Sequence, residues 1–376
     1  MHDEINSASR FGWLGRSLAT LAMACIAFDA VGAEPIVVVE SLPLTGAGFT
    51  ASTRIVAGTT AAIDAFNRAG GVGGRAVKLV TADDGNDAGR HAANLRQLVE
   101  GRHPVALLNC VGDASCAAAA GVARATQVPL IGPMSGAAAL RSIADAPVYC
   151  IRPDVSLEAA ALAGQLKSLG VADVAILTDS AGAAGTPAIL VEALRRKGLA
   201  ARVVRTRPAT MQAALADANH ASTLLIDLDL DGAEALGELP PAAFEGDARV
   251  VASLATPGLS TITRLFPGRV IGFTAVMPQP ELPNSPLVRS LQRDSEALGP
   301  DAMTYEGLEA YVATLVALEA IRRAGPQASA RTVGVEMARL GHVDVGGFVM
   351  NFGRPGRSAS EWVDIGLRAR NGTLLR

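Results

Sequence analysis

Carboxylates in the stretch IDLDLDGAEALGE have the spacing of a calcium-binding loop. Asp227, Asp229 and Asp231 alternate along the chain. Gly232 follows directly, and Glu238 stands at the twelfth position of the pattern. Such a loop lies between two helices, whereas the preceding residues STLLI are typical of a buried strand. The pattern therefore leaves three interpretations open: a calcium loop, a solvated strand-to-helix turn, and a ligand-binding role for Asp227 or Asp229.

Cysteine chemistry is the second candidate. Cys110 and Cys116 could form a disulfide in an exported protein, which would leave Cys150 as an odd thiol. The alternative is that all three are small buried hydrophobic residues. Cys110 could also act as a nucleophile with a distant histidine, but the sequence contains no nucleophile-elbow motif. We therefore predict that the protein is not an enzyme and needs no cofactor and no resident metal.

The N-terminal segment has the features of a secretory signal peptide. Arg10 and Arg16 precede the apolar run SLATLAMACIAFDAVGA, which ends in small residues at Val31 and Ala33. We expect cleavage after Ala33, so that residues 1–33 are a signal peptide and the protein reaches the periplasm. Cleavage before Cys25 with attachment of a lipid is the alternative.

Composition narrows the functional classes further. The chain has 376 residues, of which 49% are hydrophobic and 18% are charged, as in a folded protein with a large core. The formal net charge of −3 and the aromatic content of 4% argue against a nucleic-acid partner.

Short apolar runs alternate with helical patterns along the chain. PIVVVE, AVKLVTA, PVALLNC and VPLIG are typical of buried strands, with helical spacing between them, at 52–69 and 114–126 for example. The same alternation restarts after VYCIRPD, with a helix expected at 232–239. Two long helices are expected at 285–298 and 304–324, before closing strands near GGFVMNF and EWVDIGL. This alternation predicts two α/β lobes, each a parallel sheet covered by helices on both faces.

Several separated motifs then occur in a recognisable order. PLTGAG, DAFNRAGGVGGRAVKLVTADDGND, VPLIGPMSGAAALR and MTYEGLEAYVAT resemble the branched-chain amino-acid type periplasmic binding proteins, the solute receptors of ABC importers. The resemblance runs from about Pro35 to the C-terminus. It implies two doubly wound lobes joined by a three-strand hinge, the type I architecture of these receptors. They close, without catalysis, on a small polar ligand, an amino acid or a related compound. It also implies an ABC permease as partner and a monomeric protein.

Lobe boundaries follow from the resemblance and from the position of the first crossing. We expect an N-terminal lobe of residues 34–152 plus 277–343 and a C-terminal lobe of residues 153–276 plus 344–376. A ligand sensor that feeds a regulator or a receptor kinase is the alternative function, and an enzyme on a similar two-lobed frame is a third.

The resemblance also places the ligand site. Receptors of this family hold the ligand carboxylate with a hydroxyl and amides after the third strand, where this chain has Asp113 and then Ser115. The next strand's loop supplies Met134, Ser135 and Gly136.

In the second lobe, Asp229 stands near a position where relatives carry a tyrosine, and Ser253 lies in the segment where amino-acid receptors place a glutamate. A buried Asp113 would disfavour a ligand carboxylate. Acidic groups at Asp113, Asp227 and Asp229 would suit a ligand that bears a cation or is rich in hydroxyl donors.

Overall fold

The computed structural model describes residues 34–142, 145–180, 185–256, 259–282, 284–353, 357–371 and 374–375, which belong to one unit, Glu34–Arg376. The expected signal peptide and the alternative lipid site at Cys25 lie outside these residues. Within the same ranges, no helix combines the length and the apolar character needed to cross a bilayer.

The first sheet has five parallel strands in the described part of the chain. Alternate side chains enter different cores because successive residues of a strand point to opposite faces. Val38 packs into one hydrophobic cluster, and Val39 packs into another on the other face. In the order in which they lie side by side, the strands are β2 (Val77–Asp83), β1 (Ile36–Leu42), β3 (Ala106–Leu108), β4 (Leu130–Ile131) and β5 (Val148–Tyr149).

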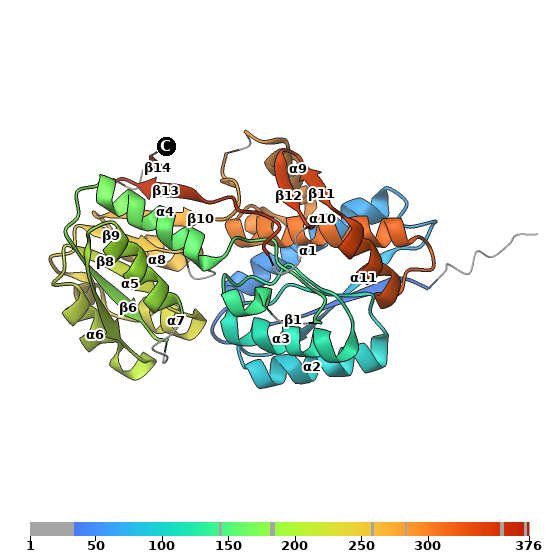
Figure 1. The fold of residues 1–376 in the computed structure, drawn as a ribbon, viewed down its shortest axis with the longest axis horizontal. Helices are drawn as coiled ribbons and strands as arrows, with labels where there is room; N and C mark the ends of the chain where they lie inside the picture. Colours follow the sequence, from blue (N-terminus) through green and yellow to red (C-terminus); the bar gives the residue numbers. More distant parts are fainter. Residues whose placement is uncertain are drawn as a thin grey trace, which may run out of the picture. The chain divides into compact units, whose positions relative to one another are not determined.

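Helices cover both faces of this sheet (Figure 1). One face carries α2 (Ala88–Arg102) and α3 (Asp113–Thr126). The opposite face carries α1 (Phe49–Arg68), α9 (Pro286–Asp294), α10 (Tyr305–Ala324) and α11 (Ala330–Arg339). A hairpin of β11 (His342–Val345) and β12 (Phe348–Asn351) adds Phe348 and Met350 to the hydrophobic core on the face that carries α1 and α10.

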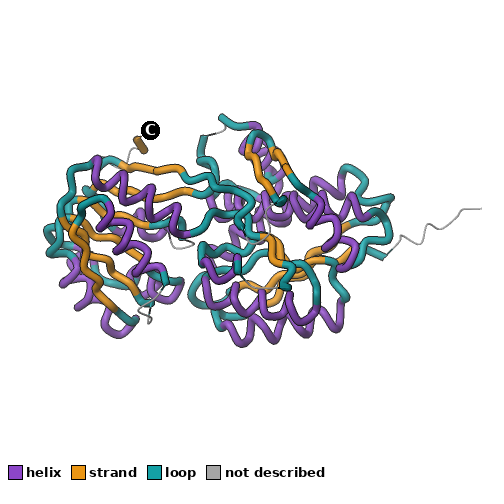
Figure 2. The backbone as a smooth tube through the Cα atoms, in the orientation of Figure 1, coloured by secondary structure: helices purple, strands orange, loops and turns teal. Residues whose placement is uncertain are grey.

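The second sheet is mixed. Its described strands lie in the order β14 (Leu374–Leu375), β13 (Asp364–Arg368), β10 (Val270–Ala275), β9 (Val250–Ser253), β8 (Thr223–Asp227), β6 (Asp173–Thr178) and β7 (Ala200–Arg205). β13 runs antiparallel to both β10 and β14, and the other pairs are parallel. α4 (Val155–Ser168) and α5 (Thr186–Arg196) pack on one face, and α6 (Met211–Ala218), α7 (Leu230–Gly237) and α8 (Leu259–Leu265) on the other (Figure 2).

Short 3-10 helices interrupt the connections. They are Ala138–Arg141, Pro208–Thr210, Pro241–Phe244, Glu296–Leu298 and Pro300–Ala302.

The chain passes between the two sheets three times in the described residues. The passages begin at Cys150 after β5, at Val276 after β10 and at Phe352 after β12. The predicted fold class of two α/β lobes with a three-strand hinge is confirmed, whereas the lobe boundaries stay a prediction.

Some local expectations were wrong. The helix expected at 232 begins two residues earlier, because the Asp229 side chain accepts a hydrogen bond from Gly232 N and so caps the helix there. The helix expected at 285–298 ends at Asp294, and α6 and α8 were not foreseen. The two closing strands lie in different sheets: β12 pairs with β11, and β13 pairs with β10.

Candidate functional site

A cavity of about 550 Å³ lies where the carboxyl ends of strands from both sheets meet. Its walls come mainly from the segments that follow β3, β4, β6, β8 and β9, namely 111–115, 134–137, 179–180, 226–231 and 254–256. β1 lies between β2 and β3, and β6 lies between β7 and β8, so each sheet reverses its strand order at this edge. Ligands of open α/β sheets bind at such reversal points. We call this cavity the cleft.

The first-lobe wall is built on the start of α3. Gly112 has φ 80°, a backbone angle that favours glycine, and Asp113 is the first helical residue. The Ser135 hydroxyl donates to Asp113 Oδ1 at 2.5 Å and accepts from Ala137 N at 3.1 Å. Ser135 is therefore the partner of the aspartate and is not free to donate to a ligand carboxylate.

Neighbouring residues fix this wall in place. Met134 N donates to Cys110 O at 3.1 Å, and a disulfide joins Cys110 to Cys116 in the first turn of α3. The disulfide interpretation of these cysteines therefore holds, and Cys150 is a buried free thiol. Gly136 O accepts from Val155 N at 3.0 Å, and a Cβ at Gly136 would lie 3.0 Å from Val155 Cβ. A side chain at this position would require Val155 to shift by a few tenths of an ångström.

The second-lobe wall carries three aspartates at strand ends. Asp227 ends β8 and accepts from the Thr178 hydroxyl at 2.9 Å. Asp179 follows β6, and its carboxyl accepts from Asp229 N at 3.1 Å. Burial and the neighbouring Asp229 carboxyl raise the pKa of Asp179 to about 8. Burial, together with repulsion from Asp113 and Asp229, raises the pKa of Asp227 to about 6 against the lowering effect of the Thr178 hydroxyl.

The structure brings most of the predicted site residues together. The residues that line the cleft are Asp113, Ser115, Met134, Ser135, Gly136, Asp227 and Asp229. Ser253 does not line it: its side chain is fully buried in β9, and its hydroxyl donates to Leu254 O at 3.0 Å. The ligand-binding roles of all eight residues stay predictions.

The calcium-like stretch is a strand followed by a helix. Asp229 caps α7, Asp231 accepts from Asn86 Nδ2 at 3.0 Å, and Glu238 lies at the far end of the same helix. In the described residues, no group of three or more histidine, cysteine, aspartate or glutamate side chains is placed to hold a metal. The stretch thus combines a helix cap with three residues, Asp227, Asp229 and Asp231, that line the cleft.

Sequence reasoning missed two acids of the cleft, Asp179 and Glu158. Asp179 ends the strand run DVAILTD, a position comparable to that of Asp227, and this signal could have found it. Glu158 lies inside α4 and is 2% exposed, and nothing in its local sequence distinguishes it from a surface residue.

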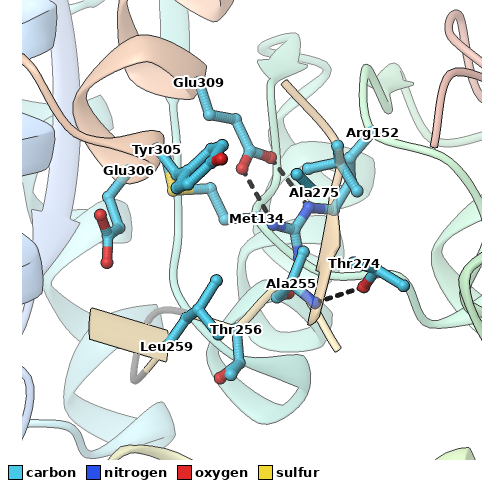
Figure 3. A pocket seen from close by; sticks show the side chains of 11 residues that line it. Met134, Arg152, Ala255, Thr256, Leu259, Thr274, Ala275, Tyr305, Glu306 and Glu309 are labelled. Atoms are coloured by element: carbon cyan, nitrogen blue, oxygen red, sulfur yellow. Dashed lines mark hydrogen bonds and ion pairs between the residues drawn. The ribbon is translucent and has the colours of Figure 1, made fainter. Parts of the chain in front are cut away.

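Arg152 and Glu309 form a buried ion pair beside the cleft (Figure 3). Arg152 Nε and Nη2 each donate to one oxygen of Glu309 at 2.9 Å, and Nη1 donates to Ala255 O at 3.2 Å. Glu309 belongs to α10 of the first lobe and Ala255 follows β9 of the second. The arginine in the first passage between the sheets therefore links the two lobes.

A second buried carboxylate stands next to this arginine. Glu158 accepts from the Thr274 hydroxyl at 2.6 Å and from Ala255 N at 3.0 Å. Burial raises its pKa, against the effect of nearby Arg152. A small cavity of about 20 Å³ adjoins the pair and is lined by Tyr305 and Glu306, which do not line the cleft itself (Figure 3).

One contact across the cleft is apolar. Leu230, at the start of α7 in the second lobe, packs into a first-lobe cluster and is 7% exposed. The partners are Leu42, Ala47, Ala51, Ile55, Val111, Met134 and Ala310. A Cβ on Gly48 would lie 2.6 Å from Leu230 Cδ1, which shows how tightly the side chain is held. The structure therefore has the two walls in contact.

Two lobes that present the carboxyl ends of their strands to one shared cleft define a two-lobed α/β binding fold. A family profile described as periplasmic binding protein matches residues 35–361. The chain belongs to this family, as the resemblance predicted. No curated protein matches the chain.

Solved structures agree with this assignment. A substrate-binding periplasmic protein from Ralstonia solanacearum is 25% identical, with a TM-score of 0.79 over 90% of this chain and 99% of that one. A branched-chain amino acid ABC transporter protein from Thermus thermophilus with bound valine is 15% identical, with a TM-score of 0.73 over 91% and 94%. A fatty acid ABC transporter substrate-binding protein from Thermomonospora curvata is 14% identical, with a TM-score of 0.74 over 91% of each chain. The fold thus serves ligands of different chemistry, so the ligand must be argued from the cleft.

Proposed function

We propose that the chain is an extracytoplasmic receptor that closes on a small polar solute and delivers it to an ABC permease. The observation that carries the proposal is the cleft itself. Its volume of about 550 Å³ suits a small molecule, and it combines aliphatic walls with carboxyl and hydroxyl groups from both lobes. Closure of the lobes would bury the ligand and create the surface that a permease recognises.

Binding without turnover is part of the proposal. The thiol of Cys110, a candidate nucleophile in the sequence, is held in a disulfide. The described residues that line the cleft include neither histidine nor cysteine. Their polar groups are carboxyls, hydroxyls, amides and the guanidinium of Arg152, which can bind and orient a solute.

Export through the N-terminal signal peptide also belongs to the proposal. The Cys110–Cys116 disulfide supports it, because disulfides persist in the periplasm and are rare in the cytosol. In this proposal the receptor acts as a monomer, with the ligand held by Asp113, Ser115 and Asp227 and by the loop at Met134, Ser135 and Gly136.

The test has a binding stage and a transport stage. The exported protein is screened by thermal unfolding against amino acids, amides, amines, alcohols and dicarboxylates. A solute present at a hundred times its Kd should add about 2.7 kcal/mol to the free energy of unfolding. Deletion of the gene should then abolish high-affinity uptake of that solute.

Two results would contradict parts of the proposal. Binding with unchanged uptake in the deletion strain would favour a sensor that feeds a regulator or receptor kinase. Chemical conversion of the bound solute would show an enzyme on a two-lobed frame.

A further inference from the structure

The cleft is lined by more acidic than basic side chains. The only cationic side chain among its described lining residues is Arg152, and both of its bidentate hydrogen bonds go to Glu309, which lies outside the lining. The acids that line the cleft are Asp113, Glu158, Asp179, Asp227, Asp229 and Asp231. Arg152 also attracts Glu158 and Asp113, but it is one cation among six acids, so a cationic ligand would meet an excess of acidic groups.

The acids stand on both walls. Asp113 lies at the start of α3 in the first lobe, and Asp227 lies at the end of β8 in the second. Their repulsion contributes to the raised pKa of Asp227. Closure in the absence of a ligand brings like charges towards each other, whereas a cation between the walls would attract both.

Ser115 is a second, independent indication of a ligand. It lines the cleft and is 7% exposed, and its hydroxyl has no hydrogen-bond partner among the described residues. The hydroxyl oxygen is accessible to solvent, so a ligand in the cleft can replace water as its hydrogen-bond partner. Its lone pairs can accept from an N–H group. The nearby Ser135 hydroxyl already donates to Asp113, so this pair offers acceptors to a ligand.

The remaining lining indicates an organic ligand. Apolar side chains from both lobes, such as Val111, Met134 and Ile226, share the cleft with the acids. A volume of about 550 Å³ is an order of magnitude larger than the roughly 30 Å³ that one water molecule occupies in the liquid, so a bare metal ion would leave the walls without contacts.

We propose that the cleft binds a small organic cation, an amine or amidine without a carboxylate, held between Asp113 and Asp227 with the Ser115 hydroxyl as an acceptor. This inference rests on the receptor function proposed above and narrows its ligand class. The aliphatic lining contacts the body of the ligand, and the facing carboxylates select its charge. Zwitterionic amino acids are disfavoured because their carboxylate would meet Asp113.

The first test compares ligands of matched shape on the full-length gene product, purified after export. The cations are 1-aminobutane, 1,4-diaminobutane and benzamidine. The neutral counterparts are 1-butanol, 1,4-butanediol and benzamide, and leucine, valine and calcium chloride complete the panel. At least one cation should raise the Tm, with the neutral counterparts and the amino acids without effect.

Each other result has a distinct meaning. Stabilisation by leucine, valine or a neutral compound, but by no cation, overturns the cationic class and leaves the receptor function standing. Stabilisation by calcium alone overturns the organic class. If neither this panel nor the wider screen stabilises the protein, the receptor function fails as well.

The second test measures the Kd of the most strongly stabilising amine in variants. Asp113→Asn and Asp227→Asn keep the shape of each side chain and remove its charge, from different lobes. Each should weaken binding at least about 30-fold, which corresponds to about 2 kcal/mol. Asp247→Asn is the matched control, because Asp247 is in the same lobe as Asp227 but its side chain is 79% exposed and does not line the cleft.

Salt provides a further check, because screening should weaken the binding of a cation. Changes below about 3-fold in both cleft variants would overturn the assignment of Asp113 and Asp227 as charge partners. Weakening by Asp247→Asn to the same extent would overturn it too, because the effect would then come from overall charge.

Discussion

Truncation of Leu230 to alanine should separate closure of the lobes from the stability of each lobe. Leu230 is the first residue of α7, and its partners in the hydrophobic cluster all belong to the first lobe. The substitution deletes three carbon atoms. At about 0.8 kcal/mol for each buried CH₂, the closed form loses about 2 kcal/mol relative to an open form in which the side chain meets water.

A loss of this size should weaken ligand binding by roughly 30-fold if only the closed form holds the ligand tightly. Titration calorimetry with the solute found in the thermal screen measures the Kd. Small-angle scattering measures whether the unliganded variant has a larger radius of gyration than the unsubstituted protein, as a population shift towards the open form requires.

Leu236→Ala is the matched control on the same helix. Leu236 is fully buried in the core of the second lobe, so its truncation should lower the free energy of unfolding by about 2–5 kcal/mol and leave the Kd nearly unchanged. The reasoning is refuted if Leu230→Ala changes the Kd by less than about 3-fold, or if it destabilises the fold as much as Leu236→Ala does.

Three further predictions concern stability. Glu309→Gln removes the hydrogen-bonded charge partner of the buried Arg152 and should cost about 3–5 kcal/mol in urea unfolding, whereas Glu319→Gln, in a more exposed pair on the same helix, should cost less than about 1 kcal/mol. Burial and the Asp229 carboxyl raise the pKa of Asp179 to about 8, so between about pH 4 and 8 the folded state binds more protons than the unfolded state. The free energy of unfolding should therefore fall as the pH rises through this range, and this slope should flatten in Asp179→Asn. Reduction of the Cys110–Cys116 disulfide, which joins residues six positions apart at the start of α3, should lower the free energy of unfolding by about 2 kcal/mol, and an unchanged urea midpoint would contradict this.

The architecture could be predicted because its signals are local and repeated. On β8, Leu224 and Ile226 pack into one core while Leu225 packs into the other. A continuous apolar run of this kind indicates a strand that is buried on both faces. The helix at 305–324 was predicted almost to the residue, because its apolar pattern is long and Thr304 caps it. The short helices α6 and α8 were not predicted, because with eight and seven residues they show little helical periodicity in their apolar positions.

The site could be predicted from the sequence only in part, for a different reason. Asp113 could be placed near a ligand by the resemblance to the family, and Asp227 because it ends a predicted strand of the second lobe. Glu158 could not, because its burial depends on Thr274 and Ala255, which are about a hundred residues away in sequence. A contact such as that of Leu230 with the opposite lobe likewise depends on how the lobes meet.

Charge and closure are coupled in this cleft. Asp227 is faced by Thr178, Asp113 and Asp229, and its pKa of about 6 reflects burial and repulsion that no described cation relieves. A bound cation would stabilise the ionised form and lower that pKa, so binding should release protons near pH 6 and its affinity should rise with pH through this range. Without a ligand, the apolar contact of Leu230 favours closure while the carboxyls oppose it. A cation removes the opposing term, so ligand binding itself can drive the lobes together.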